Sequence, residues 1–445
     1  MEFFPNQYGK NIPLGHLVFC SMWEKFERIW ASRDIRKSIL VVFGLLVIFR
    51  LVAHIPIPGV NVANLRSYLE GNQILGLLNL FSGGTLQNFS VVMLGVGPYI
   101  TASIIVQLLT MIIPSLEELS KEGESGQNKI NLYTRLITVP LAFLQSYATI
   151  KLLSQAAEPI MGTLTLGRVL TIMLTITAGT MFLMWIGEII TEQKVGNGIS
   201  LLIFAGIVSS LPTTLSTAYV NYTSTDLTMY VLFVAAAILT VVGVVFMNEG
   251  QRNIPVSYAK QVRGNRVYGG SNSHLPFRVN MAGVIPIIFA ISLILFPPMV
   301  AQFFTHAKAD WLVRLATGTI QLFNNKTFYN ILYFLLVFGF TYFYSAVIFH
   351  PQKIAENLQK QGGFVPGIRP GKETEIYLGS MMNRLNLIGA LFLGLIAILP
   401  LIVQTTLGSQ SFSVGGTSLL IVVAVAIETA KQIESQLTMH EYDTI

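Results

Sequence analysis

Residues that could do chemistry are few in this sequence, and their spacing matches no catalytic motif. The single cysteine, Cys20, excludes an intramolecular disulfide and a cysteine-rich metal site. There is no P-loop, no HExxH, and no GxSxG with a nearby histidine. Six histidines are scattered along the chain: His16, His54, His274, His306, His350 and His440. We therefore expect no enzymatic activity, no metal site and no cofactor.

The composition explains this scarcity of polar chemistry. Of 445 residues, 52% are hydrophobic and 11% are charged, and the mean hydropathy is +0.61. So few charges cannot cover a water-exposed surface, since soluble proteins carry about a quarter charged residues. The apolar residues come in long blocks rather than in amphipathic stripes, so the solvent that they face is lipid. The sequence predicts a multi-spanning membrane protein.

Ten apolar stretches have about the length that a membrane span requires. They cover residues 39–55, 89–113, 136–153, 169–190, 199–220, 227–247, 281–304, 329–349, 385–404 and 412–429. The first carries Arg50 near one end, from where the side chain could reach the headgroups. The last is the weakest, because Gly415 and Gly416 interrupt it. The expected fold is an all-α integral membrane protein with ten transmembrane helices.

Lysine and arginine lie unequally on the two sides of this map. Twenty-one of the 28 fall on the side that holds both termini, and seven fall on the other. Because positively charged loops stay in the cytoplasm, both termini are expected there. The expected organisation is a cytoplasmic segment 1–38, an N-terminal half 39–220, a C-terminal half 221–432 and a cytoplasmic tail 433–445.

Ten spans divide into two halves of five, and an odd number of spans in each half predicts an inverted, pseudo-symmetric pair. The second span of each half is interrupted by glycine and proline, at residues 95–98 (GVGP) and 283–286 (GVIP). Matching interruptions point to a functional site between the halves. Two ordinary proline kinks would give the same pattern, and no residue-level repeat decides between the two interpretations.

Ionisable residues avoid the middle of the spans. Glu188, Glu428 and Lys431 lie at cytoplasmic ends, whereas Arg50 and His54 lie at the outer end of the first span. A secondary transporter of a small solute, the alternative function, would need a charge or a proton relay at the midplane. A non-conducting insertase would need a hydrophilic groove with a central positive residue. An uncharged passage suits a pathway that excludes ions by dewetting and binds no particular polymer.

Three segments between spans need an explanation. Loops 248–280 and 350–384 each carry five positive residues and are too long for simple connectors. The second contains PGIRPG at 366–371, which would present Arg369 on a fixed tip. A docking platform for an acidic or phosphate-rich partner and a mere topology signal both remain open. On the outer side, residues 76–85 are apolar but too short to span, so they lie at the headgroups or fold back as a stopper.

Seven motifs, in order along nearly the whole chain, resemble the bacterial SecY family, the channel subunit of the Sec protein translocase. They are FSGG (81–84), GPYITASII (97–105), KEGESG (121–126), GE with GNGIS (187–188 and 196–200), YGG through NMAGVIP (268–286), PGIRPG (366–371) and GGTSLLI (415–421). One such motif is weak evidence, whereas seven in family order are strong.

The resemblance assigns residues to a mechanism. The family's hourglass pore narrows to an apolar ring, which corresponds to Val96, Ile100, Ile199, Ile203, Ile288 and Ile421. A plug, about residues 73–86, closes the outer funnel, with Leu75, Leu77, Leu78, Leu80, Phe81, Ser82, Gly83 and Gly84. A lateral gate opens between spans two and three and spans seven and eight, where Gln107, Thr134 and Asn280 match polar positions. Each of these three could equally make a helix-packing hydrogen bond.

The family passes unfolded secretory polypeptides across the membrane and releases transmembrane segments sideways into lipid. Arg369 and Arg266 match positions that engage the SecA motor ATPase or the ribosome. The resemblance also implies SecE-like and SecG-like small subunits, signal sequences, nascent polypeptides and membrane lipids as partners. It implies a location in the bacterial cytoplasmic membrane. Residues 1–30 and the outer loop 305–327 match no part of the family pattern and receive no role.

Overall fold

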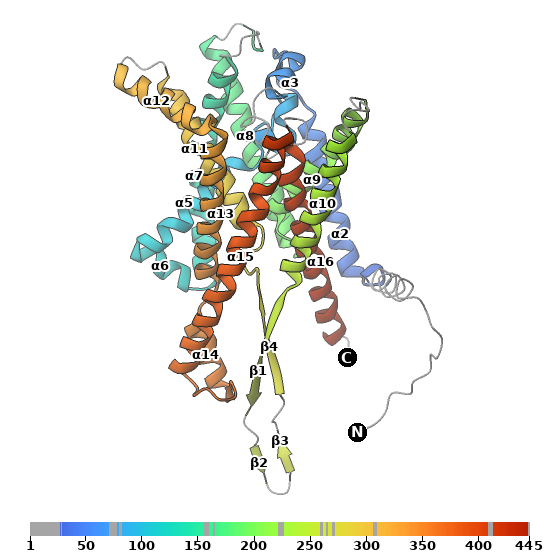
Figure 1. The fold of residues 1–445 in the computed structure, drawn as a ribbon, viewed down its shortest axis with the longest axis vertical. Helices are drawn as coiled ribbons and strands as arrows, with labels where there is room; N and C mark the ends of the chain where they lie inside the picture. Colours follow the sequence, from blue (N-terminus) through green and yellow to red (C-terminus); the bar gives the residue numbers. More distant parts are fainter. Residues whose placement is uncertain are drawn as a thin grey trace.

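The computed structural model describes residues 27, 29–70, 78–79, 82–154, 160–162, 165–220, 227–258, 261–263, 266–268, 272–305, 309–407 and 413–443. A helix occupies each of the ten stretches that hydropathy singled out. In chain order these are α2 (Arg33–Ala53), α5 (Gly97–Ile112), α7 (Glu124–Ser154), α8 (Leu166–Glu192), α9 (Gly198–Val220), α10 (Leu227–Glu249), α11 (Ile285–Phe304), α13 (Lys326–Ile348), α15 (Lys372–Leu407) and α16 (Ser413–Asp443). They form one elongated bundle (Figure 1).

Several of these helices can cross a membrane by themselves. In the described part of the chain, five are long and apolar enough: Glu124–Ser154, Leu166–Glu192, Ile285–Phe304, Lys326–Lys360 and Lys372–Leu399. A sixth candidate is α5 together with α6 (Pro114–Lys121), a pair bent by 102°. The chain is therefore a multi-pass membrane protein. The expectation that Gly415 and Gly416 interrupt the last span is wrong, because α16 begins before them and accommodates both in its first turn.

The second span of each half begins at its glycine-proline interruption. Gly95 has φ +58° and Gly283 has φ +62°, left-handed values that glycine adopts without strain. Each helix starts two residues later, with proline in its first two positions, where a missing N–H costs nothing. Residues 91–96, expected inside a helical span, form turns instead. The helical part of this span is therefore only 16 residues long.

One end of the bundle carries α3 (Val62–Glu70) and α12 (Asp310–Asn324), and the other carries α14 (Pro351–Lys360) and the strands (Figure 1). The loop 305–327 is thus largely helical. Trp311, Leu315 and Leu322 lie on one side of α12 and are each more than half exposed, whereas Ala316 is buried. The helix joins the end of α11 to the start of α13, with apolar residues on two of its sides.

The loop 248–280 departs from the expected all-α fold, and that expectation is wrong here. It forms β1 (Gln251–Tyr258), β2 (Gln261–Arg263), β3 (Arg266–Tyr268) and β4 (Asn272–Arg278). The strands β1 and β4 pair antiparallel, and β2 and β3 pair beyond them (Figure 1). Ile254 and Val256 are buried while Asn253 and Pro255 are exposed, which is the two-residue period of a strand. This local alternation, rather than the long apolar blocks, determines the structure of the loop.

The loop 350–384 is also more structured than expected. It contains α14, then β5 (Gly363–Phe364), and α15 already begins at Lys372. Because β5 pairs with β1, the sheet order is β4-β1-β5 and the two long loops form one folded unit. An apolar cluster that includes Ile254, Phe277, Val365 and Leu378 stabilises this unit, which we call the platform.

Candidate functional site

Residues from both halves of the chain meet in the largest apolar cluster of the bundle, here called the central cluster. Five of the six residues matched to the pore ring belong to it, and the sixth, Ile199, packs against it; the other five are Val96, Ile100, Ile203, Ile288 and Ile421. Five are between 2% and 4% exposed, and Ile199 is partly buried against the same cluster. These six residues, which we call the waist, present only hydrocarbon. Their role as the lining of a pore remains a prediction.

Two of the waist residues occupy equivalent places in the two halves. Ile100 lies four residues after Val96, the N-cap of α5, and its N–H donates to Val96 O at 3.1 Å. Ile288 lies four residues after Val284, the N-cap of α11, and its N–H donates to Val284 O at 3.3 Å. Each isoleucine therefore lies in the first turn of a helix that begins at the glycine-proline break.

The start of α9 positions two more waist residues. Asn197 Oδ1 accepts the N–H of Ile199 at 3.1 Å, which satisfies one of the free donors at this helix end. Close packing requires glycine on both sides: a Cβ on Gly187 would lie 2.7 Å from Ile199 Cδ1, and the backbone of Gly187 leaves no room for a Cβ on Gly198. Ile203 follows one turn later, on the same face as Ile199.

Four of the eight residues matched to the plug lie within the described residues: Leu78, Ser82, Gly83 and Gly84. The other four, Leu75, Leu77, Leu80 and Phe81, lie outside them. The Leu78 side chain is partly buried and packs against the central cluster as well as a second cluster around Leu86 and Phe89. The described part of this segment therefore packs against protein.

Residues 82–86, which we call the plug root, are held by a dense set of hydrogen bonds. The Gly84 N–H donates to Asn79 O at 2.7 Å, and the Ser82 hydroxyl donates to Asn79 O at 2.9 Å. Thr85, which is fully buried, has its hydroxyl 2.9 Å from Ser82 O. Ser82 and Leu86 are also buried. This burial favours the folded-back interpretation over a position at the headgroups.

Arg50 makes a contact that sequence reasoning missed. The expectation was a side chain that reaches the headgroups, but Arg50 Nη1 donates to Gly83 O at 2.9 Å, across 33 residues of sequence. The guanidinium carbon also lies 5.8 Å from the ring centroid of Phe49. No local pattern predicts such a long-range bond. The one signal in the sequence was a lone cation inside an apolar stretch.

The three residues matched to the lateral gate have separate surroundings. Gln107 Oε1 is buried and has no hydrogen-bond partner among the described residues. Thr134 is buried and its hydroxyl donates to Ile130 O, within its own helix. Asn280 Nδ2 donates to Asn248 Oδ1 at 2.7 Å, and Asn280 Oδ1 accepts the N–H of Gly283 at 3.1 Å. Thr134 and Asn280 are thus helix-packing or turn-forming residues in this conformation, and a gating role remains a prediction.

The two sides of the predicted gate touch in this conformation. α11 packs against both α5 and α7. Tyr147 of α7 and Phe303 of α11 stack with ring centroids 5.3 Å apart. An ion pair also joins α7 to α8, with Arg135 Nε 2.7 Å from Glu188 Oε1. Both of these side chains are partly exposed. The stacked pair across the predicted gate is aromatic, and the charged pair lies within one half.

The platform presents the two arginines matched to partner binding. Arg369 is exposed on the turn between β5 and α15, where Gly367 and Gly371 both have positive φ. Thr374, which is buried, fixes this turn by donating to Arg369 O at 2.9 Å. Arg266 begins β3 and pairs with Arg263 across the smaller sheet. Both arginines thus belong to the end of the bundle that carries the strands.

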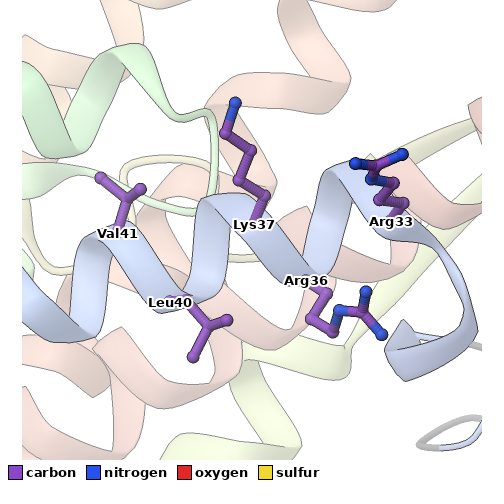
Figure 2. A pocket seen from close by; sticks show the side chains of 5 residues that line it. All are labelled: Arg33, Arg36, Lys37, Leu40 and Val41. Carbon is purple, nitrogen blue, oxygen red and sulfur yellow. The ribbon is translucent and has the colours of Figure 1, made fainter.

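A shallow pocket lies at the start of α2, where positively charged side chains give way to apolar ones. Arg33, Arg36 and Lys37 line it together with Leu40 and Val41 (Figure 2). Arg33, Lys37 and Val41 point to one side of the helix, and Arg36 and Leu40 point to the other (Figure 2). The change from cations to exposed apolar side chains within two turns fits a helix that enters a membrane here.

Comparison with known proteins gives a family for this arrangement. The family model described as SecY matches residues 90–430. This chain belongs to the SecY family. It is 44% identical over 432 residues to the protein translocase subunit SecY of Corynebacterium glutamicum, covering 92% of this chain and 97% of that relative. It is 43% identical over 439 residues to the same subunit of Streptomyces coelicolor, covering 95% and 99%.

Solved structures show the same fold at lower sequence identity. One is of SecY, in which the plug domain stabilises the closed state of the translocation channel; its TM-score is 0.58 at 18% identity, over 89% of this chain and 91% of that chain. Another is Sec61 in the canine ribosome-channel complex, with a TM-score of 0.58 at 17% identity over the same shares. The bundle is therefore a SecY fold.

Proposed function

We propose that this SecY-family chain is a protein-conducting channel that passes unfolded polypeptides across the membrane and releases transmembrane segments sideways into lipid. The observation that carries this proposal is the waist, where six apolar residues from both halves of the chain gather in the central cluster. A narrow apolar passage resists wetting, so it excludes ions when idle. It also offers no specific partner to a passing chain, so sequences of many kinds can cross.

The lateral gate lies between α5 and α7 on one side and α11 and α13 on the other. Stacking of Tyr147 on Phe303 and the apolar packing of α11 support this location, because such contacts can separate without leaving unpaired polar groups. An apolar signal helix binds the open seam better than the closed one, and this difference in affinity shifts the gate toward the open state. Gln107 lies on α5 and Thr134 on α7, whereas Asn280 lies in the turn that precedes α11.

Energy comes from partners, since the sequence contains no nucleotide-binding P-loop and the chain is not an enzyme in this account. The exposed Arg369 and the strand-borne Arg266 engage the SecA motor ATPase or the ribosome. The canine relative in a ribosome-channel complex supports the second partner. SecE-like and SecG-like small subunits complete the assembly.

The membrane topology follows from the ten helices and the charge bias. We place ten spans in two inverted halves of five, in the bacterial cytoplasmic membrane, with both termini in the cytoplasm. The equivalent positions of Ile100 and Ile288 support the inverted repeat. In this topology the cations at the start of α2 and the platform lie on the cytoplasmic side. The plug, about residues 73–86, then closes the outer funnel.

Reconstitution separates this function from its alternative. Proteoliposomes containing the chain and its co-purified membrane subunits are given a radiolabelled secretory precursor with a SecA-type motor and ATP. We expect protease-protected precursor, and no uptake of small solutes against a gradient. A preparation that accumulates a solute but never protects or crosslinks a precursor would instead identify a secondary transporter.

A further inference from the structure

The plug root is held by one residue outside its own segment that carries a full charge. Arg50 of α2 donates from Nη1 to Gly83 O at 2.9 Å. The side chain is half-buried, and its guanidinium lies beside Phe49, which is only 1% exposed. A hydrogen bond from a charged donor is stronger than a neutral one, and more so where water is scarce.

Gly83 is also in close contact with α9. A Cβ on Gly83 would lie 3.1 Å from Gly206 Cα and 3.2 Å from Phe49 Cζ, and the backbone of Gly83 leaves no room for a Cβ on Gly206. Gly83 also has φ +76°, in the left-handed region that favours glycine. α2 and α9 therefore both pack closely against Gly83, and the carbonyl of Gly83 accepts the hydrogen bond from Arg50.

We propose that Arg50 is a positioning residue that holds the plug root against α2 and α9, so that displacement of the plug requires the Arg50–Gly83 bond to break. This inference rests on the proposed function. The competing role is the one expected from the sequence, a cation that reaches the outer headgroups and leaves the root alone. The two roles predict different effects on the plug root when the guanidinium is removed: the first predicts that the root opens more readily, and the second predicts no change.

Amide hydrogen exchange of the full chain in lipid nanodiscs tests the contact directly. The N–H groups of Ser82, Gly84 and Leu86 all donate within this segment, so their exchange reports opening of the root. Arg50→Ala is expected to speed exchange of the peptide covering residues 78–90 by roughly tenfold. Arg50→Lys retains a charged donor and is expected to restore most of the protection. Arg168→Ala is the matched control, because Arg168 also lies on the outer side but donates to a glycine carbonyl outside the measured peptide, Gly59 O.

Resting conductance in planar bilayers separates this inference from the proposed function. Faster exchange and higher conductance in Arg50→Ala, both reversed by lysine, support the inference. Unchanged exchange overturns it, whatever the conductance does. Faster exchange with unchanged conductance supports the role of Arg50 and contradicts the plug as a seal. If Arg50→Ala fails to assemble, Gly206→Ala, which pushes Gly83 away while keeping the arginine, must speed exchange, and unchanged exchange there overturns the inference.

Discussion

The waist and the platform are stabilised by different kinds of interaction. The waist is hydrocarbon packed on hydrocarbon, which is non-directional. The platform depends on the register of β1 with β4 and β5, and on a turn with Gly367 and Gly371 at positive φ. Apolar surfaces can part and meet again without leaving unpaired polar groups, whereas a strand register cannot slip without exposing its core face. The waist side chains, which are proposed to separate, are hydrocarbon and form no directional bonds, whereas the platform, which is proposed to dock, is fixed by such bonds.

The largest effect is expected from reversing one charge on the platform. Arg369→Glu should abolish motor-driven export, because a negative charge at this exposed position on a fixed turn repels an acidic partner. Resting conductance should stay unchanged, since the waist is untouched. Precursor translocation into proteoliposomes measures the first property, and planar-bilayer recording measures the second.

Lys353→Glu is the matched control for this variant. It makes the same charge change on the exposed α14 of the same loop. Normal export by Arg369→Glu, or an equal loss of export in both variants, would mean that the loop serves only as a topology signal. A leak in Arg369→Glu would show that platform and waist are not independent.

Opening the waist is expected to change resting conductance and to leave partner binding intact, the reverse of the outcome expected for Arg369→Glu. Replacing Ile199 and Ile288 together by glycine removes two branched side chains from the seal, so resting ion conductance should rise several-fold while partner binding persists. Ile238→Gly with Ile388→Gly is the control, because both isoleucines are more than half exposed on the outside of the bundle. Unchanged conductance in the waist variant would remove these residues from the seal.

A directional bond beside the waist should show an intermediate effect, on stability. Asn280→Ala leaves Asn248 and the Gly283 N–H without their bonds at a buried position, which should cost about 1–3 kcal/mol and lower the unfolding temperature. Asn325→Ala removes an exposed cap at the start of α13 and should cost about 1 kcal/mol. A larger loss at Asn325 would contradict the turn-forming role given to Asn280.

The smallest effect is expected at the ion pair between α7 and α8. Arg135→Gln removes a pair whose side chains are 46% and 23% exposed, and such pairs contribute about 0–1 kcal/mol. Thermal unfolding should therefore change little, and the seal should not change. A large fall in export for this variant would mean that a charged contact within one half also controls the moving part.

The structure of the bundle could be predicted from the sequence better than that of the platform, for a physical reason. Long apolar blocks have one solution in lipid, so the helices fall at all ten expected stretches. Glycine before proline located the starts of α5 and α11. The hairpin of β1 and β4 was missed because its signal is two buried residues, Ile254 and Val256, within a polar loop. Contacts such as Arg50 with Gly83 join distant parts of the chain, and no local pattern encodes them.

Site-specific photo-crosslinking of a stalled secretory precursor tests the central claim most directly. A crosslinker placed at Ile203 or at Ile288 should capture the precursor, whereas one placed at the outward-facing Ile388 should not. Crosslinks from Ile388 alone, or lipid adducts in place of precursor at Ile203 and Ile288, would contradict a polypeptide path through the waist.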